Sequence, residues 1–282
     1  MFVKTSFLAA GLMASTALGH ALHKRDTFGC GAPEPSEELL FKAGEMATQE
    51  KAVKESGIKF AQAAISVPTW FHVVAASQSE EDGYVSDAQL EEQLAVLNDN
   101  FAPSGISFTL AGTTRTINSN WADDGAELTM KKSLRKGDYG TLNVYFQREI
   151  GGNLGYCYFP DNVSSGSNDF YYDGCSILSA SVPGGSATNY NLGKTTTHEV
   201  GHWFGLYHTF QGGCTGSGDQ IADTPAQASS SSGCPTGRDS CPSQAGLDPI
   251  HNYMDYSDDA CYEEFTEDQI TRMTNMWNTY RA

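Results

Sequence analysis

The segment from His198 to His208, HEVGHWFGLYH, contains three of the chain's seven histidines and constrains its fold more than any other feature. On an α-helix with about 100° per residue, His198 and His202 lie about 40° apart, so both imidazoles can reach one ion. Glu199 lies beside that face, close to a ligand of the ion. His208 would point about 240° away if the helix continued. We therefore expect Gly205 to end the helix with a positive φ and return His208 to the ion.

This arrangement predicts three zinc ligands, an open fourth position and a neighbouring carboxylate. A structural zinc site would instead be closed by four protein ligands. The alternative is three ordinary core or surface histidines. The glycine and the third histidine stand at fixed offsets from H-E-x-x-H, which makes that coincidence rare. The segment therefore indicates a catalytic metal site formed by His198, His202 and His208.

The spacing H-E-x-x-H-x-x-G-x-x-H is the metzincin signature, whose second element is a turn with a methionine below the metal. The segment HNYMDY offers Met254, although a methionine that only fills the core is the alternative. The form HEVGHWFGLYHTF, followed by GGC and then NYMDY, resembles the pappalysin family in its short secreted fungal form. The resemblance extends from about Pro68 to the C-terminus.

The resemblance implies hydrolysis of peptide bonds, with Glu199 as general base toward a zinc-activated water. It also implies that Tyr256 hydrogen-bonds the oxyanion of the tetrahedral intermediate, although a packing tyrosine is the alternative. Two other functions stay open: a secreted binding protein that keeps zinc for structure, and a zinc hydrolase that acts on a non-peptide bond. The intact Glu199 argues against the first, because a structural site has no use for that carboxylate.

The chain of 282 residues suits one catalytic domain plus processing segments. Residues 1–19 combine a basic residue, an apolar run and small residues, which is typical of a secretory signal peptide. No later stretch approaches about 18 unbroken apolar residues, so we expect a secreted, extracellular monomer without a membrane partner. The net charge of −17 disfavours nucleic acid. Protein or peptide substrates are the expected partners.

The chain has seven cysteines, an odd number, so at least one has no intramolecular partner. Six lie in the catalytic region and permit about 15 pairings, among which spacing does not choose. A cysteine-based metal site is an alternative that the absence of a C-x-x-C pair disfavours. The resemblance implies Cys214–Cys241 and Cys234–Cys261, which leaves Cys157 with Cys175.

Residues 20–60 are polar and typical of a pro-segment before a catalytic domain at 61–282. Lys24-Arg25 is either a dibasic processing site or two exposed charges. We expect Cys30, in FGCGAP, to occupy the fourth zinc position of a latent precursor, as the cysteine switch does in some metzincins, pappalysin relatives among them. A cut between about Glu50 and Pro68 would then open the site. The alternatives are an intermolecular disulfide, or a thiol discarded with the signal region.

Strand patterns occur at Thr69–Ala75, from Ile106, at Thr141–Phe146 and at Gly174–Ala180. Helices are expected after a Ser86/Gln89 capping box, over 125–137, from near Leu192 and after Thr266. This order predicts an α+β, metzincin-like fold: a twisted mixed sheet over the active-site helix, with a disulfide-stabilised C-terminal subdomain. The resemblance would make Gly174–Ala180 the substrate-binding edge strand. The basic residues Lys131, Lys132, Arg135 and Lys136 are expected to form a solvated face.

Three further positions have weaker signals. Asp219, Asp223 and Thr224 offer hard oxygen ligands suited to calcium, with surface carboxylates in a turn as the alternative. Asn162 opens an N-V-S glycosylation sequon. His72 and His251 are expected to be core or surface groups without a catalytic role.

Overall fold

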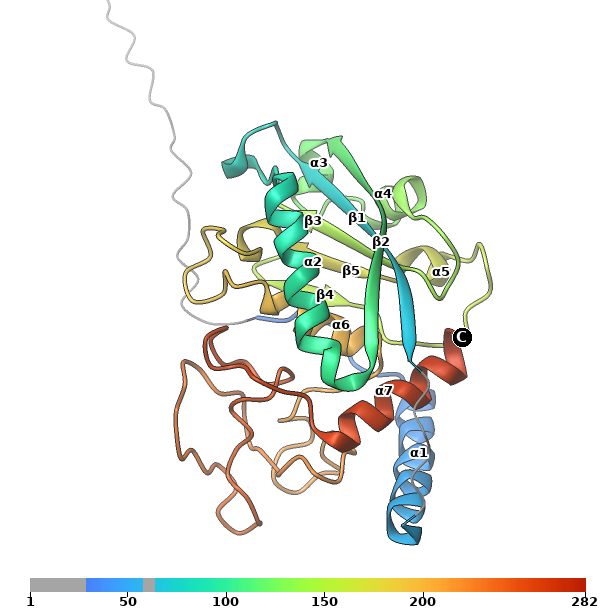
Figure 1. Cartoon of the computed structure of the whole chain (residues 1–282), viewed down its shortest axis with the longest axis vertical. Helices are drawn as coiled ribbons and strands as arrows, with labels where there is room; N and C mark the ends of the chain where they lie inside the picture. The colour runs from blue at the N-terminus through green and yellow to red at the C-terminus, as the bar shows by residue number, and fades with distance from the viewer. Residues whose placement is uncertain (1–28, 58–63) are drawn as a thin grey trace, which may run out of the picture.

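The computed structural model describes residues 29–57 and 64–282. The predicted signal peptide, Lys24-Arg25 and residues 58–63 lie outside the described residues. Within the described part, a five-stranded sheet forms the centre of the molecule, with helices against both faces (Figure 1). A long irregular segment and the last helix lie beside it.

The sheet has the order β2-β1-β3-β5-β4. Its strands are β1 (Ile65–Ala75), β2 (Ile106–Ile117), β3 (Leu142–Gln147), β4 (Gly155–Cys157) and β5 (Cys175–Leu178). The first four in that order are parallel, and β4 runs antiparallel to β5. This is the predicted mixed sheet, with each expected strand present.

The predicted edge strand is wrong. β5, which matches the expected Gly174–Ala180, lies between β3 and β4, and β4 forms that edge of the sheet. β4 is only three residues long, too short to show a period of two in the sequence. Its register places Cys157 opposite Cys175, and a disulfide joins this pair. The edge is therefore cross-linked to its neighbouring strand.

Alternating side chains of β1 face two separate cores. Phe71 and Val73 belong to the larger core, which also contains residues of α2 (Asp87–Phe101) and α6 (Lys194–Trp203). Val74 packs on the opposite face with Met130 of α4 (Glu127–Leu134). The Ser86/Gln89 capping box begins α2 as predicted. The shorter helices are α3 (Ser119–Ala122), α5 (Asn168–Tyr172) and the 3-10 turns Glu80–Asp82, Ala102–Ser104 and Ser179–Ser181.

Two of the four basic residues around α4, Lys132 and Lys136, are exposed as expected from the sequence, but the other two are not. Lys131 is fully buried, and its Nζ lies 2.7 Å from Glu127 Oε1 and 4.8 Å from the centre of the Tyr158 ring. Arg135 is also buried and forms an ion pair with Asp173 at 3.1 Å. The expectation failed for Lys131 and Arg135 because the Tyr158 ring and the Asp173 carboxylate reach them from other elements, which a local charge pattern does not reveal.

Residues 204–266 contain no helix, and their β-structure is limited to isolated bridges. Two disulfides, Cys214–Cys241 and Cys234–Cys261, cross-link this segment. All three disulfide pairs expected from the sequence are thus present. α7 (Glu267–Tyr280) follows, with a capping box from Thr266 and Gln269. Its Trp277 packs against Trp203 and Phe204 at the end of α6. No helix in the described ranges is long and apolar enough to cross a bilayer.

The N-terminal helix α1 (Glu37–Ser56) lies outside this body, beside α7 (Figure 1). Ser36 caps its first turn, and Gly57 ends it with a φ of 69°. Before α1, the segment around Cys30 runs parallel to β4 and forms an isolated bridge with Gly155. The predicted pro-segment therefore touches the catalytic body at two separate places.

Candidate active site

The predicted histidine geometry is present at the end of α6. His198 and His202 lie one turn apart on that helix, and Gly205 follows it with a φ of 88°. The Gly205 amide donates to the carbonyl of His202 at 2.8 Å, and the Leu206 amide donates to that of Gly201 at 3.0 Å. These two bonds form the Schellman ending that a left-handed glycine permits. The reversal brings His208 back beside the helix.

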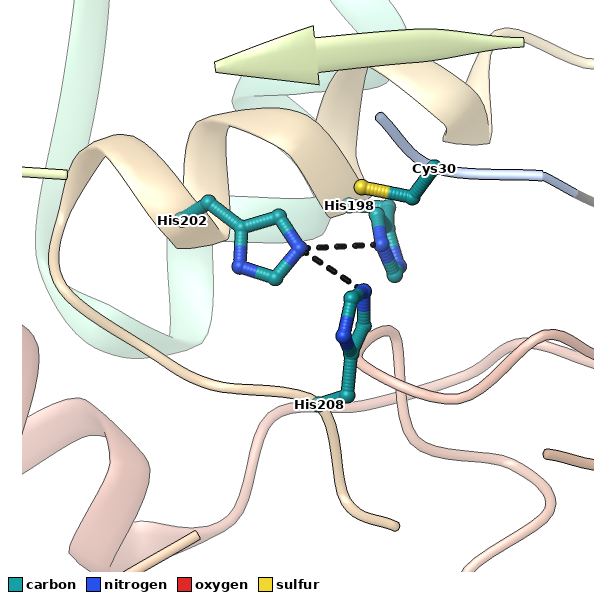
Figure 2. Close-up of side chains that lie close together, drawn as sticks. All are labelled: Cys30, His198, His202 and His208. Carbon is teal, nitrogen blue, oxygen red and sulfur yellow. Dashed lines mark hydrogen bonds between the residues drawn. The ribbon is translucent and has the colours of Figure 1, made fainter. Parts of the chain in front are cut away.

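The three imidazoles converge through their Nε2 atoms. Nε2 of His202 lies 3.2 Å from Nε2 of His198 and 3.0 Å from Nε2 of His208 (Figure 2). A tetrahedral zinc ion with Zn–N bonds of about 2.0–2.1 Å holds its nitrogen ligands about 3.3 Å apart. The spacing therefore fits such an ion.

Backbone carbonyls fix the tautomer of two ligands. Nδ1 of His198 lies 2.6 Å from the Tyr253 carbonyl, and Nδ1 of His202 lies 2.7 Å from the Leu206 carbonyl. Because a carbonyl only accepts, each Nδ1 carries the proton and each Nε2 presents a lone pair. Burial lowers the pKa of His202 to about 4 and that of His198 and His208 well below the ordinary value. Neutral imidazoles are the form that binds a metal.

Met254 packs directly below this helix, as the methionine-turn hypothesis expected. A Cβ placed on Gly201, which lies between the two helical histidines, would come within 2.4 Å of the Met254 sulfur. The side chain of Asn252 accepts from the Met254 amide at 3.0 Å, and the Met254 carbonyl accepts from Thr209. The turn thus links the base of α6 to the segment that carries His208.

Glu199 is fully buried beside the three histidines. Burial raises the pKa of its carboxyl to about 8. A Cβ on Gly155 of β4 would come within 2.8 Å of the Glu199 side chain, so only glycine leaves room there. Gly155 therefore borders the site, and the sequence did not predict it. The single available signal was one glycine among the 29 of the chain.

Cys30, on the segment before α1, points its sulfur toward the three histidines (Figure 2). Its sulfur and one ligand atom of each of the three histidines all lie within 4.8 Å of one another. The thiol lies 3.4 Å from Glu199 Oε2, and it accepts from the Ala32 amide at 3.3 Å. Burial, and then the Glu199 charge, raise the pKa of this thiol well above its ordinary value.

Tyr256 lies next to the same site, with its ring centre 5.0 Å from that of His208 and 5.7 Å from that of His198. Burial is the main cause of a raised Tyr256 pKa, and the Cys30 and Glu199 charges add to it. The hydroxyl is therefore a proton-bearing donor at neutral pH. The structure thus brings together Glu199, Tyr256 and Cys30, the residues for which the sequence predicts roles as general base, oxyanion donor and fourth zinc ligand.

The other candidates lie elsewhere. Asp219 accepts from the Thr224 hydroxyl at 2.8 Å, whereas Asp223 accepts from Thr266 and the Asp268 amide at the start of α7, so calcium binding stays a prediction. Asn162 is exposed and its glycosylation is likewise untested. The other two histidines in the described ranges lie away from the metal site: His72 bonds Thr114 and Asn143 inside the sheet, and His251 lies beside the Cys234–Cys261 disulfide.

Comparison with known proteins places this geometry among peptidases. The M43 peptidase family, described as pregnancy-associated plasma protein-A, matches residues 134–278. An extracellular metalloprotease of Neurospora crassa is 62% identical over 277 residues, which are 98% of this chain and 97% of the relative. An extracellular metalloprotease of Colletotrichum graminicola is 60% identical over 99% of this chain and 100% of its own length.

Two solved structures share the fold. Mature mirolysin of Tannerella forsythia, in complex with a cleaved peptide, has a TM-score of 0.65 and 32% identity over 78% of this chain and 93% of its own. A promirolysin mutant from the same organism has a TM-score of 0.68 and 30% identity, covering 89% of this chain and 94% of its own. The shared fold and the histidine site define a metzincin metallopeptidase. Within that class, the chain belongs to the pappalysin family, and the protein is a metalloendopeptidase.

Proposed function

We propose that the protein is a secreted zinc endopeptidase, made as a latent precursor, in which Glu199 is the general base. The observation that carries this proposal is the convergence of three neutral Nε2 donors, with a buried carboxylate on the residue next to the first ligand. The fungal relatives named extracellular metalloproteases support export. A nitrogen donor set that leaves one position open suits zinc.

A zinc ion held by His198, His202 and His208 would polarise the scissile carbonyl and make water nucleophilic near neutral pH. Glu199 accepts the proton of the attacking water and delivers it to the leaving amine. Tyr256 donates a hydrogen bond from its hydroxyl to the developing oxyanion and keeps its proton. Gly155 keeps the backbone of β4 close to the Glu199 carboxylate and so limits its movement. Proton transfer and oxyanion stabilisation are thus each assigned to one side chain of the site.

Substitution of the base separates this function from its rivals. We expect Glu199→Ala to keep one zinc per chain. Its rate of chelator-sensitive casein cleavage should fall by about 10²–10⁴-fold. Zinc is measured by mass spectrometry, and Glu263→Ala, at an exposed glutamate, is the control. A fully active Glu199→Ala enzyme would remove Glu199 from the mechanism. Absence of protein cleavage in the processed parent would favour the binding protein or the non-peptide hydrolase.

The same proposal assigns latency to Cys30. Its sulfur already lies within the histidine cluster, and the Gly31 amide donates to the Gly155 carbonyl at 2.8 Å, so this segment covers the edge strand β4. The promirolysin match covers 89% of this chain and the mature mirolysin match 78%, which supports a pro-segment here. A cysteine thiolate in the fourth position would exclude the catalytic water.

Latency is tested on the full-length precursor and its Cys30→Ala variant. We expect the variant to cleave casein without processing, whereas the parent does so only after a cut. Cobalt in place of zinc gives an independent readout, since a thiolate–cobalt absorption band should be present in the parent and absent in the variant. A variant as latent as the parent, with the same spectrum, would exclude the switch.

A further inference from the structure

Helix α1 presents one stripe of side chains to the catalytic body. Leu39, Ala43 and Met46 follow a helical spacing and are buried, and they pack with Tyr207 and with Met276 of α7. Phe41, on the outer side of α1, is 69% exposed. The helix is therefore seated by a defined apolar face.

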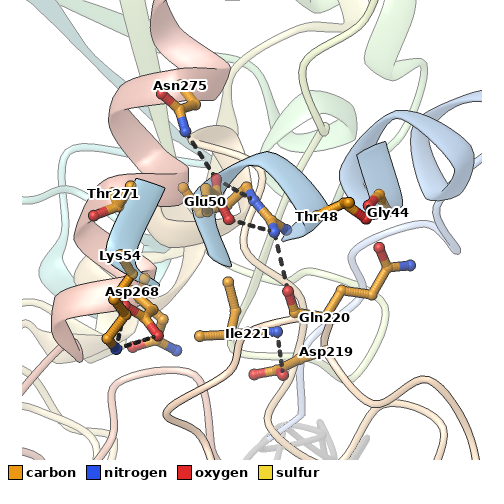
Figure 3. Close-up of polar contacts among 12 residues, drawn as sticks. Gly44, Thr48, Glu50, Lys54, Asp219, Gln220, Ile221, Asp268, Thr271 and Asn275 are labelled. Carbon is orange, nitrogen blue, oxygen red and sulfur yellow. Dashed lines mark hydrogen bonds and ion pairs between the residues drawn. The ribbon is translucent and has the colours of Figure 1, made fainter. Parts of the chain in front are cut away.

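One turn further along the same stripe, Glu50 forms the polar part of this contact (Figure 3). Its carboxylate accepts two bonds from Arg272 of α7, from Nε at 3.0 Å and from Nη2 at 2.8 Å. Asn275 adds a third bond at 2.8 Å. The Arg272 side chain is only 1% exposed, so this is a desolvated, bidentate ion pair. At the end of the helix, Lys54 reaches Asp268 at 2.8 Å.

The surface under α1 continues to the metal site. Tyr207 contacts α1 and also packs edge-to-face on Phe159, whose ring does the same with His202. The surface is nevertheless distinct from the thiol contact, because none of its bonds involves Cys30. The pro-segment thus has two anchors, one at the metal site and one on α7.

We propose that the surface under α1, comprising Tyr207, Arg272, Asn275 and Met276, is a docking site for the pro-segment after cleavage. The segment up to residue 57 then stays bound without a covalent link, and it can rebind to mature enzyme as an inhibitor. The contacts described above all come from residues before Gly57, so a cut beyond that residue leaves every one intact. This regulation rests on the proposed function, since it presupposes a processed precursor.

Glu50 supplies the selectivity of this contact. Within the described ranges, Arg272 makes one other hydrogen bond, to the Gln220 carbonyl at 3.0 Å, and Glu50 is the one residue of α1 that pairs with its charge. Removing one partner of a buried, hydrogen-bonded charge pair weakens association by about 30-fold or more. Glu55 offers a matched comparison, because it lies on the same helix and its side chain is 68% exposed.

The test uses the full-length chain with a specific protease site inserted between Gly57 and Ala64. Cys30→Ser removes the thiol anchor, and Glu199→Ala prevents self-digestion. After cutting, we expect the N-terminal fragment to co-elute with the catalytic body in size-exclusion chromatography. Adding Glu50→Gln should release it, whereas adding Glu55→Gln should not.

A second arm measures rebinding. A labelled peptide of residues 29–57 carrying Cys30→Ser is titrated into the separated catalytic body, and anisotropy should give an affinity about 30-fold weaker for the Glu50→Gln peptide. Equal affinity of the Glu50→Gln and Glu55→Gln peptides would overturn the proposal. So would loss of the fragment in chromatography from both the Glu50→Gln variant and its parent. The binding readout needs no catalysis, so an enzyme that fails to cleave casein would refute the proposed function and leave this result standing.

Discussion

The two regions that build the metal site are held together in opposite ways. Residues 64–203 form the sheet and its helices, where backbone hydrogen bonds and two apolar cores order the chain. Residues 204–266 have almost no regular structure. Some of their side chains, such as Tyr253 and Phe265, enter the larger core, and two disulfides, the Met254 turn and left-handed glycines order the rest. The proposed ligands are divided between them, since His198 and His202 come from the first region and His208 from the second. Metal binding therefore reports on both regions at once.

Removal of the ligand from the irregular region is expected to give the largest effect. His208→Ala in the processed enzyme should weaken zinc binding by about a hundredfold to a thousandfold, because each ligand supplies a share of the total binding energy. The thermal midpoint should change far less, since the disulfides and cores remain. Zinc competition titration and calorimetry measure the two quantities, with His251→Ala as control. Unchanged zinc affinity would mean that His208 is not a ligand.

Loss of a disulfide should discriminate between the regions. The Cys214–Cys241 link closes a span of 27 residues, and replacing both cysteines by serine should destabilise the protein by about 3 kcal/mol. Hydrogen exchange should accelerate around His208 but remain slow in β3. Replacing Cys157 and Cys175, which join two strands that also share backbone hydrogen bonds, should accelerate exchange at β4 and leave the irregular region protected. Uniform acceleration in both variants would mean that the regions unfold as one unit.

The smallest expected effect is the difference in stability loss between two glycine substitutions. Gly205 and Gly152 have nearly the same φ, 88° and 89°, but an added Cβ meets Met276 at 2.8 Å in the first and nothing within 4 Å in the second. Gly152→Ala should cost about 1–2 kcal/mol for the left-handed backbone alone. Gly205→Ala should cost about 1–3 kcal/mol more, from overpacking against α7. Denaturant unfolding of the two variants measures this, and equal losses would show that Met276 simply moves aside.

The sequence predicted those parts of the molecule whose cause is local. The spacing of His198, Glu199 and His202, the glycine that ends their helix and the capping boxes of α2 and α7 all depend on neighbours within a few residues. They were confirmed by the structure. Disulfide pairing was not local, and it was obtained only through resemblance to a family.

The features that were missed depend on partners distant in sequence. Lys131 is buried because three tyrosine rings and Glu127 surround it, and two of those rings belong to residues that follow it by more than twenty positions. β4 was not recognised because three residues give no periodicity, and its role follows from where it pairs. Gly155 became informative only when Glu199 was found against it.

In the proposed precursor, the position of α1 on α7 also determines the order in which latency arises during synthesis. Glu50 and Arg272 are 222 residues apart, so at roughly 5–20 residues per second the helix waits about 10–40 s for its partner to be made. Cys30 waits for the histidines in the same way. With the proposed export, its thiol meets an oxidising compartment while the six other cysteines are being made and paired. The proposed precursor must therefore complete its last helix before both anchors of its pro-segment are in place, and mispairing of Cys30 is the folding hazard that this arrangement predicts.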